Sequence, residues 1–135
     1  MRRARRPGGL AVAARGAGLV DGRPDADGRR ADRPARDKWL RRQAATEQWA
    51  GAGIPLNAVA PGVIATPMTA DLIGTPEARH ALLGLVPMPL NGIAEPIVVA
   101  RLLAWLASEE NTHLCGQIVY VDGGSDVVLR GDSVW

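Results

Sequence analysis

Apolar side chains recur at strand and helix spacing only in the part of the chain after residue 38. Residues 54–60 form a short apolar run in which Asn57 is the only polar side chain, a pattern typical of a buried parallel strand. Residues 117–121 form a second such run and predict the final strand. Residues 95–108 carry apolar side chains at helical spacing, so we expect a helix whose apolar face can be covered on more than one side.

Two further helices are expected in this part of the chain. The pattern of residues 39–50 predicts a helix that turns Trp39, Leu40 and Ala44 toward a core. The other helix begins after Thr75, whose hydroxyl can cap its first turn. Helices that alternate with short buried strands predict an α/β fold.

The charges divide the chain in two. Residues 1–42 hold 13 Lys and Arg against 5 Asp and Glu, whereas the rest holds 3 against 9. The first segment is rich in Arg, Gly, Ala and Pro and has no helical or strand period, so it cannot bury a core. We therefore divide the chain into a low-complexity basic segment, residues 1–37, and a domain, residues 38–135.

Three interpretations of residues 1–37 compete: a disordered linker or arm, a basic nucleic-acid-binding tail, and GC-rich DNA translated out of frame. An evolved basic tail mixes Lys with Arg and includes aromatic side chains. This segment mixes Asp with Arg throughout and has no aromatic residue before Trp39. The composition favours out-of-frame translation over disorder, and it favours nucleic-acid binding least.

The glycines of the first segment do not form a phosphate-binding loop. Such a loop needs Gly at fixed spacing between a strand and a helix, so that the backbone can approach the phosphates. Val12 and Ala13 stand where two of those glycines belong. We interpret Gly8, Gly9, Gly16 and Gly18 as loop composition.

No membrane, export or metal signal is found in the sequence. The apolar stretch 10–20 is short and contains Arg15, so it is not expected to span a bilayer. The lone Cys115 is ordinary for a reduced compartment, which predicts a cytoplasmic protein. His80 and His113 have no partners at ligand spacing, so no metal site is expected.

Four motifs occur in a fixed order and together carry a family resemblance. They are N-A-V-A-P-G-x-x-x-T-P at residues 57–67, Glu95-Pro96, Gly116-Gln117 and V-D-G-G at residues 121–124. In this order they resemble the carboxyl-terminal half of a short-chain dehydrogenase/reductase, over roughly residues 39–135. The resemblance implies the carboxyl-terminal portion of a Rossmann-type doubly wound parallel sheet, with NAD or NADP as the cofactor of the intact family.

The resemblance also implies a cofactor-binding set. Pro61, Gly62, the Ile64 backbone and Thr66 would line the nicotinamide pocket, and Thr66 would hydrogen-bond the carboxamide or a phosphate oxygen. Gly62 would let the backbone approach a flat ring closely. The alternative is a Pro-Gly turn that ends the strand, with Thr66 capping the next segment.

No catalytic residue is expected in this chain. The family's Tyr-x-x-x-Lys pair would fall near Arg29 and Arg33, and arginine supplies only a permanent positive charge. Lys38 is out of register, and Tyr120 lies in an apolar run where a packed strand residue is expected. With the phosphate loop also missing, we expect an inactive fragment that does not bind NAD(P)H.

By resemblance, residues 68–91 form the substrate lid over a small hydrophobic alcohol or ketone, steroids included. The spacing is most similar to the hydroxysteroid dehydrogenase and carbonyl reductase subgroup. Met68, Leu72, Leu82, Leu85 and other apolar residues of this segment would suit such a substrate, although a lid packed on its own core uses the same types.

The resemblance further implies a homo-oligomer built through the last helix and strand. One alternative function is a non-catalytic module that docks on a full-length relative through the same elements. Another is a nucleic-acid-binding arm on a remnant domain, which the composition of residues 1–37 makes the least favoured of the three.

Overall fold

The computed structural model describes residues 12–14 and 33–134. Its sheet has three parallel strands in the order β1-β2-β3: β1 is Val12–Ala14, β2 is Asn57–Pro61 and β3 is Ile118–Val121. Ala13 pairs with Ala58, and Val59 pairs with Val119. The two strands predicted from apolar runs are therefore confirmed as parallel neighbours.

Strand β1 corrects the expectation that the first segment contains no strand. Val12–Ala14 pairs with the first three residues of β2. Three residues are too few to show a period of two, and pairing needs only backbone groups aligned beside an existing strand. The sequence pattern alone could not reveal this strand.

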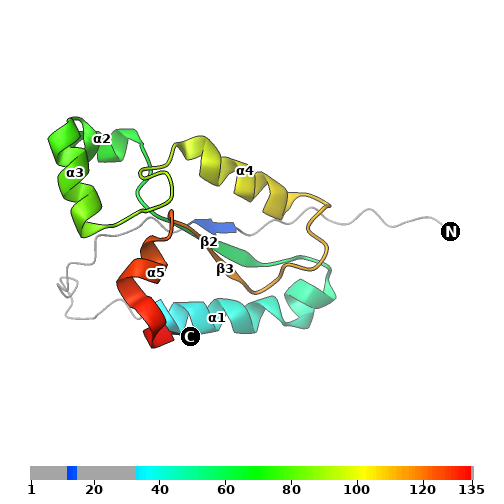
Figure 1. Cartoon of the computed structure of the whole chain (residues 1–135). Helices are drawn as coiled ribbons and strands as arrows, with labels where there is room; N and C mark the ends of the chain where they lie inside the picture. Colours follow the sequence, from blue (N-terminus) through cyan, green and yellow to red (C-terminus); the bar gives the residue numbers. More distant parts are fainter. Residues whose placement is uncertain (1–11, 15–32, 135) are drawn as a thin grey trace, which may run out of the picture.

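Helices cover both faces of the sheet. Helix α1 (Arg33–Ala44) and helix α4 (Pro96–Ala107) lie on opposite faces (Figure 1). A π-helical turn, η1 (Glu47–Gly51), follows α1. The helix predicted for residues 39–50 thus starts earlier, and Trp39, expected to face the core, is 61% exposed while Leu40 is buried.

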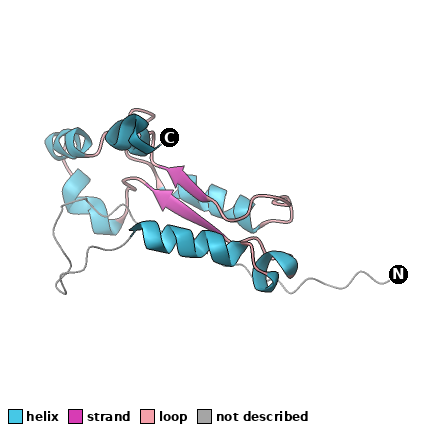
Figure 2. Cartoon of the chain, turned by 90° about the horizontal axis from the view of Figure 1, so that it is seen from below, coloured by secondary structure: helices cyan, strands magenta, loops and turns pink. Residues whose placement is uncertain are grey.

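A helical excursion lies beyond the carboxyl ends of the strands. It comprises η2 (Pro67–Thr69), α2 (Ala70–Ile73) and α3 (Pro76–Leu85), on the side toward which the strand arrows point (Figure 2). The Thr75 hydroxyl accepts a hydrogen bond from the Ala78 N–H at 3.1 Å, so the predicted cap is confirmed. After β3 come α5 (Ser125–Arg130) and η3 (Gly131–Val134), which no sequence pattern predicted.

Two apolar clusters form the core of the described residues. The first packs α1 against the sheet, and the second packs the helical excursion against the segment after β2. The first contains Leu40, Ala44, Leu56 and Ala58, with Cys115 at its edge; the second contains Val63, Ile73, Leu82 and Met88. Helix α1 and the helical excursion are therefore each anchored by their own apolar contacts.

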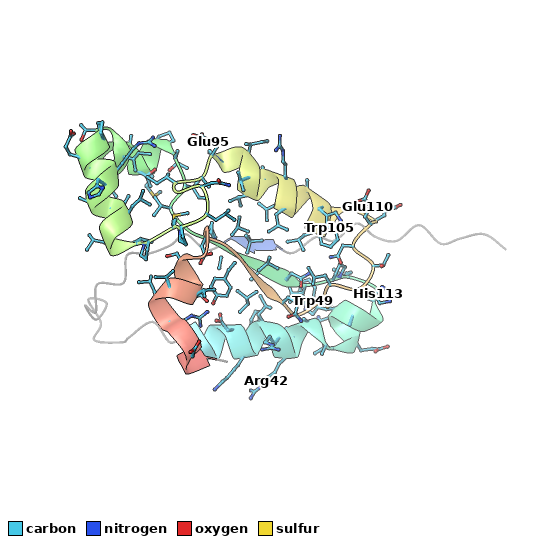
Figure 3. All side chains as sticks on the ribbon, in the orientation of Figure 1. Arg42, Trp49, Glu95, Trp105, Glu110 and His113 are labelled. Atoms are coloured by element: carbon cyan, nitrogen blue, oxygen red, sulfur yellow. The ribbon has the colours of Figure 1, made fainter. Side chains whose placement is uncertain are left out.

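Asn57 joins β2 to the segment before β3. Its side chain is 2% exposed, its amide group donates to the Leu114 carbonyl at 2.7 Å, and its oxygen accepts from the Gln117 N–H at 3.0 Å. Asn111, also buried, ties the same loop to Leu106 and Leu114. Figure 3 shows this loop, which carries Glu110 and His113, at the end of the molecule opposite α2 and α3. Asn57 therefore has a structural role, as a buried amide with both of its polar ends paired.

Gly62 brings the ends of β2 and β3 together. A Cβ atom at Gly62 would lie 2.8 Å from Asp122 Cα and 2.9 Å from Met88 Cε. The Gly62 N–H also donates to the Val121 carbonyl at 3.0 Å. Three segments distant in sequence therefore meet at a point where no side chain fits.

We expect Asn57→Ala to lower the free energy of unfolding by about 2 kcal/mol, because it removes both hydrogen bonds of a buried amide, takes away the acceptor of the Gln117 N–H and leaves the Leu114 carbonyl with Asn111 alone. Chemical denaturation monitored by circular dichroism would measure the loss. The matched control is Gln117→Ala, whose exposed side chain donates only to the Cys115 carbonyl and should change stability by less than about 0.5 kcal/mol. Equal losses in the two variants would contradict the role assigned to Asn57.

Gly62→Ala should destabilise the protein by about 1–3 kcal/mol, because the new methyl group overlaps backbone as well as a side chain. Gly84→Ala is the control: Gly84 lies in α3, and no atom lies within 4 Å of the place that its methyl group would take, so the substitution should stabilise by up to about 1 kcal/mol. Thermal unfolding of the two variants would show opposite shifts. A neutral Gly62→Ala variant would mean that the strand ends can separate freely.

Candidate functional site

The four residues predicted to bind the cofactor lie together at the carboxyl end of β2. Pro61 is the last residue of the strand, Gly62 is buried, and Ile64 and Thr66 are half-buried. Ligands of open α/β sheets bind outside the carboxyl ends of the strands. The structure therefore places the predicted set where such a ligand would bind.

A short bridge fixes the backbone of this loop. Ile64 pairs with Ala94 in parallel, with the Ala65 N–H donating to the Ala94 carbonyl at 2.9 Å and the Ala94 N–H donating to the Val63 carbonyl at 3.1 Å. The Ile64 carbonyl accepts the Thr69 hydroxyl at 2.7 Å. Within the part of the chain that the structure describes, the Ile64 N–H has no hydrogen-bond acceptor. It is thus a backbone donor held in a fixed position.

The Thr69 hydroxyl also holds this loop in place, although Thr69 was not among the predicted site residues. Its hydroxyl oxygen accepts from the Thr66 N–H at 2.9 Å and lies 2.7 Å from the Ile64 carbonyl oxygen. The Thr-x-x-Thr spacing was the available signal, since a hydroxyl three residues on can reach back to a cap backbone. Thr69 therefore preorganises the loop segment that contains both Ile64 and Thr66.

Thr66 also occupies the position that the alternative interpretation gave it. It is the N-cap residue of η2, in extended conformation, and Pro61 ends β2 as a strand-terminating proline should. Its hydroxyl oxygen lies 3.3 Å from that of Thr69, a long contact. The turn-and-cap geometry leaves this hydroxyl able to bond a ligand.

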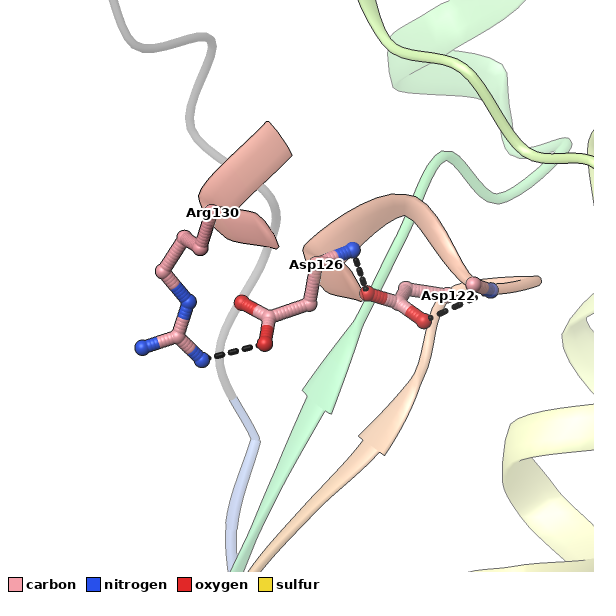
Figure 4. A network of polar contacts seen from close by, with 4 residues as sticks. Asp122, Asp126 and Arg130 are labelled. Carbon is pink, nitrogen blue, oxygen red and sulfur yellow. Dashed lines mark hydrogen bonds and ion pairs between the residues drawn. The ribbon is translucent and has the colours of Figure 1, made fainter. Parts of the chain in front are cut away.

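Gly62 has a reason to be glycine that does not involve a ligand. The space that a side chain would take is filled by Asp122 and Met88. Asp122 is itself held in place, because its carboxylate accepts the N–H groups of Gly124 at 3.0 Å and Asp126 at 2.7 Å (Figure 4). The close approach predicted for a cofactor ring at Gly62 stays a prediction.

An open hollow of about 510 Å³ adjoins Thr66. Its walls are small or apolar except for Thr66 and Arg79: Ala65, Thr66, Pro67, Ala70, Ile73, Gly74 and Arg79. The Arg79 Nε–H donates to the Ile73 carbonyl at 2.9 Å and so satisfies a carbonyl at the end of α2. Arg79 was not among the predicted site residues, because a lone arginine on a helix carries no spacing signal.

The apolar residues of the predicted lid divide into two groups. Ile73, Leu82 and Met88 are buried in the lid's own core, as the alternative interpretation allowed. Met68, Leu85 and Leu90 are 92%, 67% and 68% exposed, and with Leu72 they are the large apolar lid residues that are exposed. This second group is the one available for binding a substrate.

The described residues do not assemble a Tyr and Lys pair. Arg29 lies outside the described residues, Arg33 is the first residue of α1, and Lys38 is exposed. Tyr120 was expected to be packed, but it is 43% exposed on β3 with the Arg130 guanidinium 5.1 Å from its ring centroid. An edge strand has no neighbour to bury its outer residues, so a cation covers the ring instead.

Arg130 also pairs with Asp126 one turn earlier in α5 (Figure 4). The hydrogen bond that it donates to Asp126 is the main cause that raises the pKa of the Arg130 guanidinium above its ordinary value. An exposed ion pair of this spacing contributes little to stability. Its effect is to orient the guanidinium over Tyr120.

The described residues contain no group of three His, Cys, Asp or Glu side chains placed to hold a metal ion. His113 contacts only the Thr112 hydroxyl, at 2.8 Å, and lies far from the end of β2 (Figure 3). Among the helices that are described, none has the length and hydropathy needed to cross a lipid bilayer.

Comparisons with known proteins agree with this geometry. Residues 38–126 match the family model described as enoyl-(acyl carrier protein) reductase. The chain is 42% identical to 3β-hydroxysteroid dehydrogenase 1 of Eggerthella lenta over 77 residues, 57% of this chain and 29% of the relative. It is 35% identical to galactitol 2-dehydrogenase (L-tagatose-forming) of Cereibacter sphaeroides over 128 residues, 88% of this chain and 50% of the relative.

A solved structure supports the same conclusion. The 3α-hydroxysteroid dehydrogenase of Pseudomonas sp. B-0831, complexed with NADH, superposes with a TM-score of 0.58 at 33% identity, over 73% of this chain and 37% of that one. The chain thus spans half or less of the length of these relatives. Because a family model matches well over half of the chain and the fold agrees, the protein belongs to the short-chain dehydrogenase/reductase family.

Proposed function

We propose that residues 38–135 form the nicotinamide- and substrate-binding portion of an NAD(P)-dependent oxidoreductase that interconverts a hydroxyl and a carbonyl group. The observation that carries this proposal is the pair of polar groups at the end of β2. The Ile64 N–H has no acceptor among the described residues, and Thr69 is the one described residue that the Thr66 hydroxyl contacts. A nicotinamide carboxamide offers both an acceptor and a donor to such a pair.

These residues would bind and orient rather than react. When bound, the nicotinamide supplies hydride transfer, and this chain holds the ring at the carboxyl end of β2. The Ile64 N–H would donate to the carboxamide oxygen, and the Thr66 hydroxyl would accept from its NH₂ group or donate to a phosphate oxygen. Thr69 fixes both groups before the ligand arrives, which lowers the entropic cost of binding.

We further propose that this chain alone is catalytically inactive. No tyrosine and lysine pair is assembled in its described part, and arginine cannot replace a phenol that passes a proton to a carbonyl oxygen. The adenosine and pyrophosphate portion of a dinucleotide also finds no Gly-rich loop in the sequence. The lone Cys115 supports a cytoplasmic location.

The proposed substrate is a small hydrophobic alcohol or ketone, steroids included. Exposed Met68, Leu72 and Leu85 on the lid support this class. So does the match to two enzymes whose names specify hydroxysteroids. Galactitol 2-dehydrogenase, matched over a longer span, is named for a polar sugar alcohol, so the family does not fix the substrate by itself.

The division of the chain at residue 37 stays a proposal, because one observation supports it and two others connect the first segment to the domain. The family match begins at residue 38, which supports the division. The pairing of β1 with β2 and the match over 88% of the chain, which must reach into residues 1–37, connect part of the first segment to the domain. Out-of-frame translation would have to account for both.

A second candidate function is docking on another subunit, either a second copy or a full-length relative. Ile97, Val98 and Trp105 share one face of α4 and are between 41% and 53% exposed. These three residues define the α4 apolar surface. Exposed large apolar residues gathered on one helix face are typical of an interface.

If the site is assigned correctly, nicotinamide mononucleotide should shift the Ile64 amide resonance in NMR spectra of the chain, with weak affinity. Thr66→Val should reduce that shift, whereas Thr112→Val, in the distant loop, should not. Calorimetry should detect no tight NADH or NADPH binding, because the adenosine portion finds no partner. Tight dinucleotide binding would refute the fragment proposal, and an unmoved Ile64 resonance would refute the site.

For the docking candidate, Ile97→Glu should weaken self-association or binding to a full-length relative at least about tenfold, because it places a charge in an apolar contact. Analytical ultracentrifugation would measure it. Leu85→Glu makes the same change at a residue of similar exposure on α3 and should have no effect. Equal effects from both variants would argue against an interface on α4.

A further inference from the structure

Arg79 carries a charge that the described structure does not neutralise. It lies in the first half of α3, is exposed, and uses one N–H, at Nε, to bond the Ile73 carbonyl at 2.9 Å. In the described part of the chain it forms no ion pair with a carboxylate. A guanidinium has five N–H donors, so four remain on the two Nη atoms.

Arg79 lines the open hollow beside Thr66. The other lining residues are alanines, proline, isoleucine and glycine, so Thr66 and Arg79 are its only polar side chains. The volume of about 510 Å³ is within the range of small-molecule sites, 300–1,000 Å³ as a rough guide. One wall is therefore cationic and the rest is apolar.

The acids closest to Arg79 in sequence do not line the hollow. Asp71 and Glu77 lie in the first turns of α2 and α3, where the helix dipole stabilises a carboxylate, and neither lines the hollow. His80, the next residue after Arg79, does not line it either. Arg79 is thus the one charged group among the lining residues.

We propose that this hollow binds an oxyanion, a carboxylate or a phosphate, carried by an otherwise apolar ligand. The planar guanidinium matches the two oxygens of such a group, and the Nε bond to Ile73 holds the plane in position before binding. Thr66 is the other polar residue that lines the hollow. The proposal deepens the proposed function by naming an anionic group on the substrate, and it rests on that function only in assigning the hollow to the substrate.

The test uses the full chain, isotopically labelled, with three small probes: hexanoate, hexanol and inorganic phosphate. Hexanoate should shift the Arg79 Nε–H resonance and the amides of Ala70 and Gly74, while hexanol, its neutral counterpart, should leave the Arg79 resonance in place. Inorganic phosphate shows whether the site prefers a phosphate group or a carboxylate. A stronger response to phosphate than to hexanoate would assign the site to a phosphate group, and a stronger response to hexanoate to a substrate carboxylate.

Variants of Arg79 distinguish the effect of its charge from the effect of its hydrogen bond to the Ile73 carbonyl. Arg79→Gln keeps a donor for the Ile73 carbonyl but removes the charge, and should weaken oxyanion binding about tenfold or more. Arg79→Lys keeps the charge and should retain part of the affinity. Arg101→Gln removes an exposed arginine on α4 and should have no effect.

The outcomes are distinct from those of the nicotinamide test. Oxyanion binding that survives in Arg79→Gln, or equal responses to hexanoate and hexanol, would overturn the proposal. Oxyanion binding that depends on Arg79 would support it even if nicotinamide mononucleotide left Ile64 unmoved. If Arg79→Gln failed to fold, the graded loss from wild type to Arg79→Lys would still decide the point.

Discussion

The contact between Gly62 and Asp122 is the constraint on which the rest of the site depends. With backbone and Met88 pressed against the Gly62 Cα, the carboxyl ends of β2 and β3 and the segment before α4 are fixed relative to one another. Gly123 reinforces this arrangement: its φ is 61°, its carbonyl accepts the Leu90 N–H at 2.9 Å, and a Cβ there would lie 2.7 Å from the Leu90 carbonyl oxygen. Gly62 of the Pro-Gly pair and Gly123 of the V-D-G-G motif are therefore both required by packing within the fold, independently of any ligand.

From that fixed point the loop after β2 is held by two independent sets of bonds. The bridge of Ile64 to Ala94 ties it to the amino end of α4, and the Thr69 hydroxyl ties Ile64 and Thr66 to each other. Among the groups that these bonds leave available in the described structure are the Ile64 N–H and the Thr66 hydroxyl. A loop that is held by its own hydrogen bonds presents such groups in a fixed position, which lowers the entropic cost of binding.

Sequence patterns predicted the structure correctly where a single stretch of chain determines its own conformation. The apolar runs predicted β2 and β3, Glu95-Pro96 predicted the start of α4, and the Thr75 cap followed from capping chemistry. They failed where the outcome depends on a partner remote in sequence. The pairing of β1, the contacts of Gly62 and the exposure of Trp39 all depend on what lies across the fold, and no local period encodes them.

The proposed binding residues and the catalytic residues of the family depend on different parts of the fold. Ile64, Thr66, Thr69 and Arg79 all lie between β2 and the end of α3, where the Gly62 contact, the bridge to Ala94 and the lid's own core position them. A catalytic phenol and ammonium would instead have to come from α1 or from upstream of it, where Arg33 stands at the first residue of the helix. The contact of Gly62, the bridge of Ile64 to Ala94 and the lid's core therefore involve no residue of α1. That separation makes the loop after β2 testable with small ligands even though the chain spans half or less of its relatives.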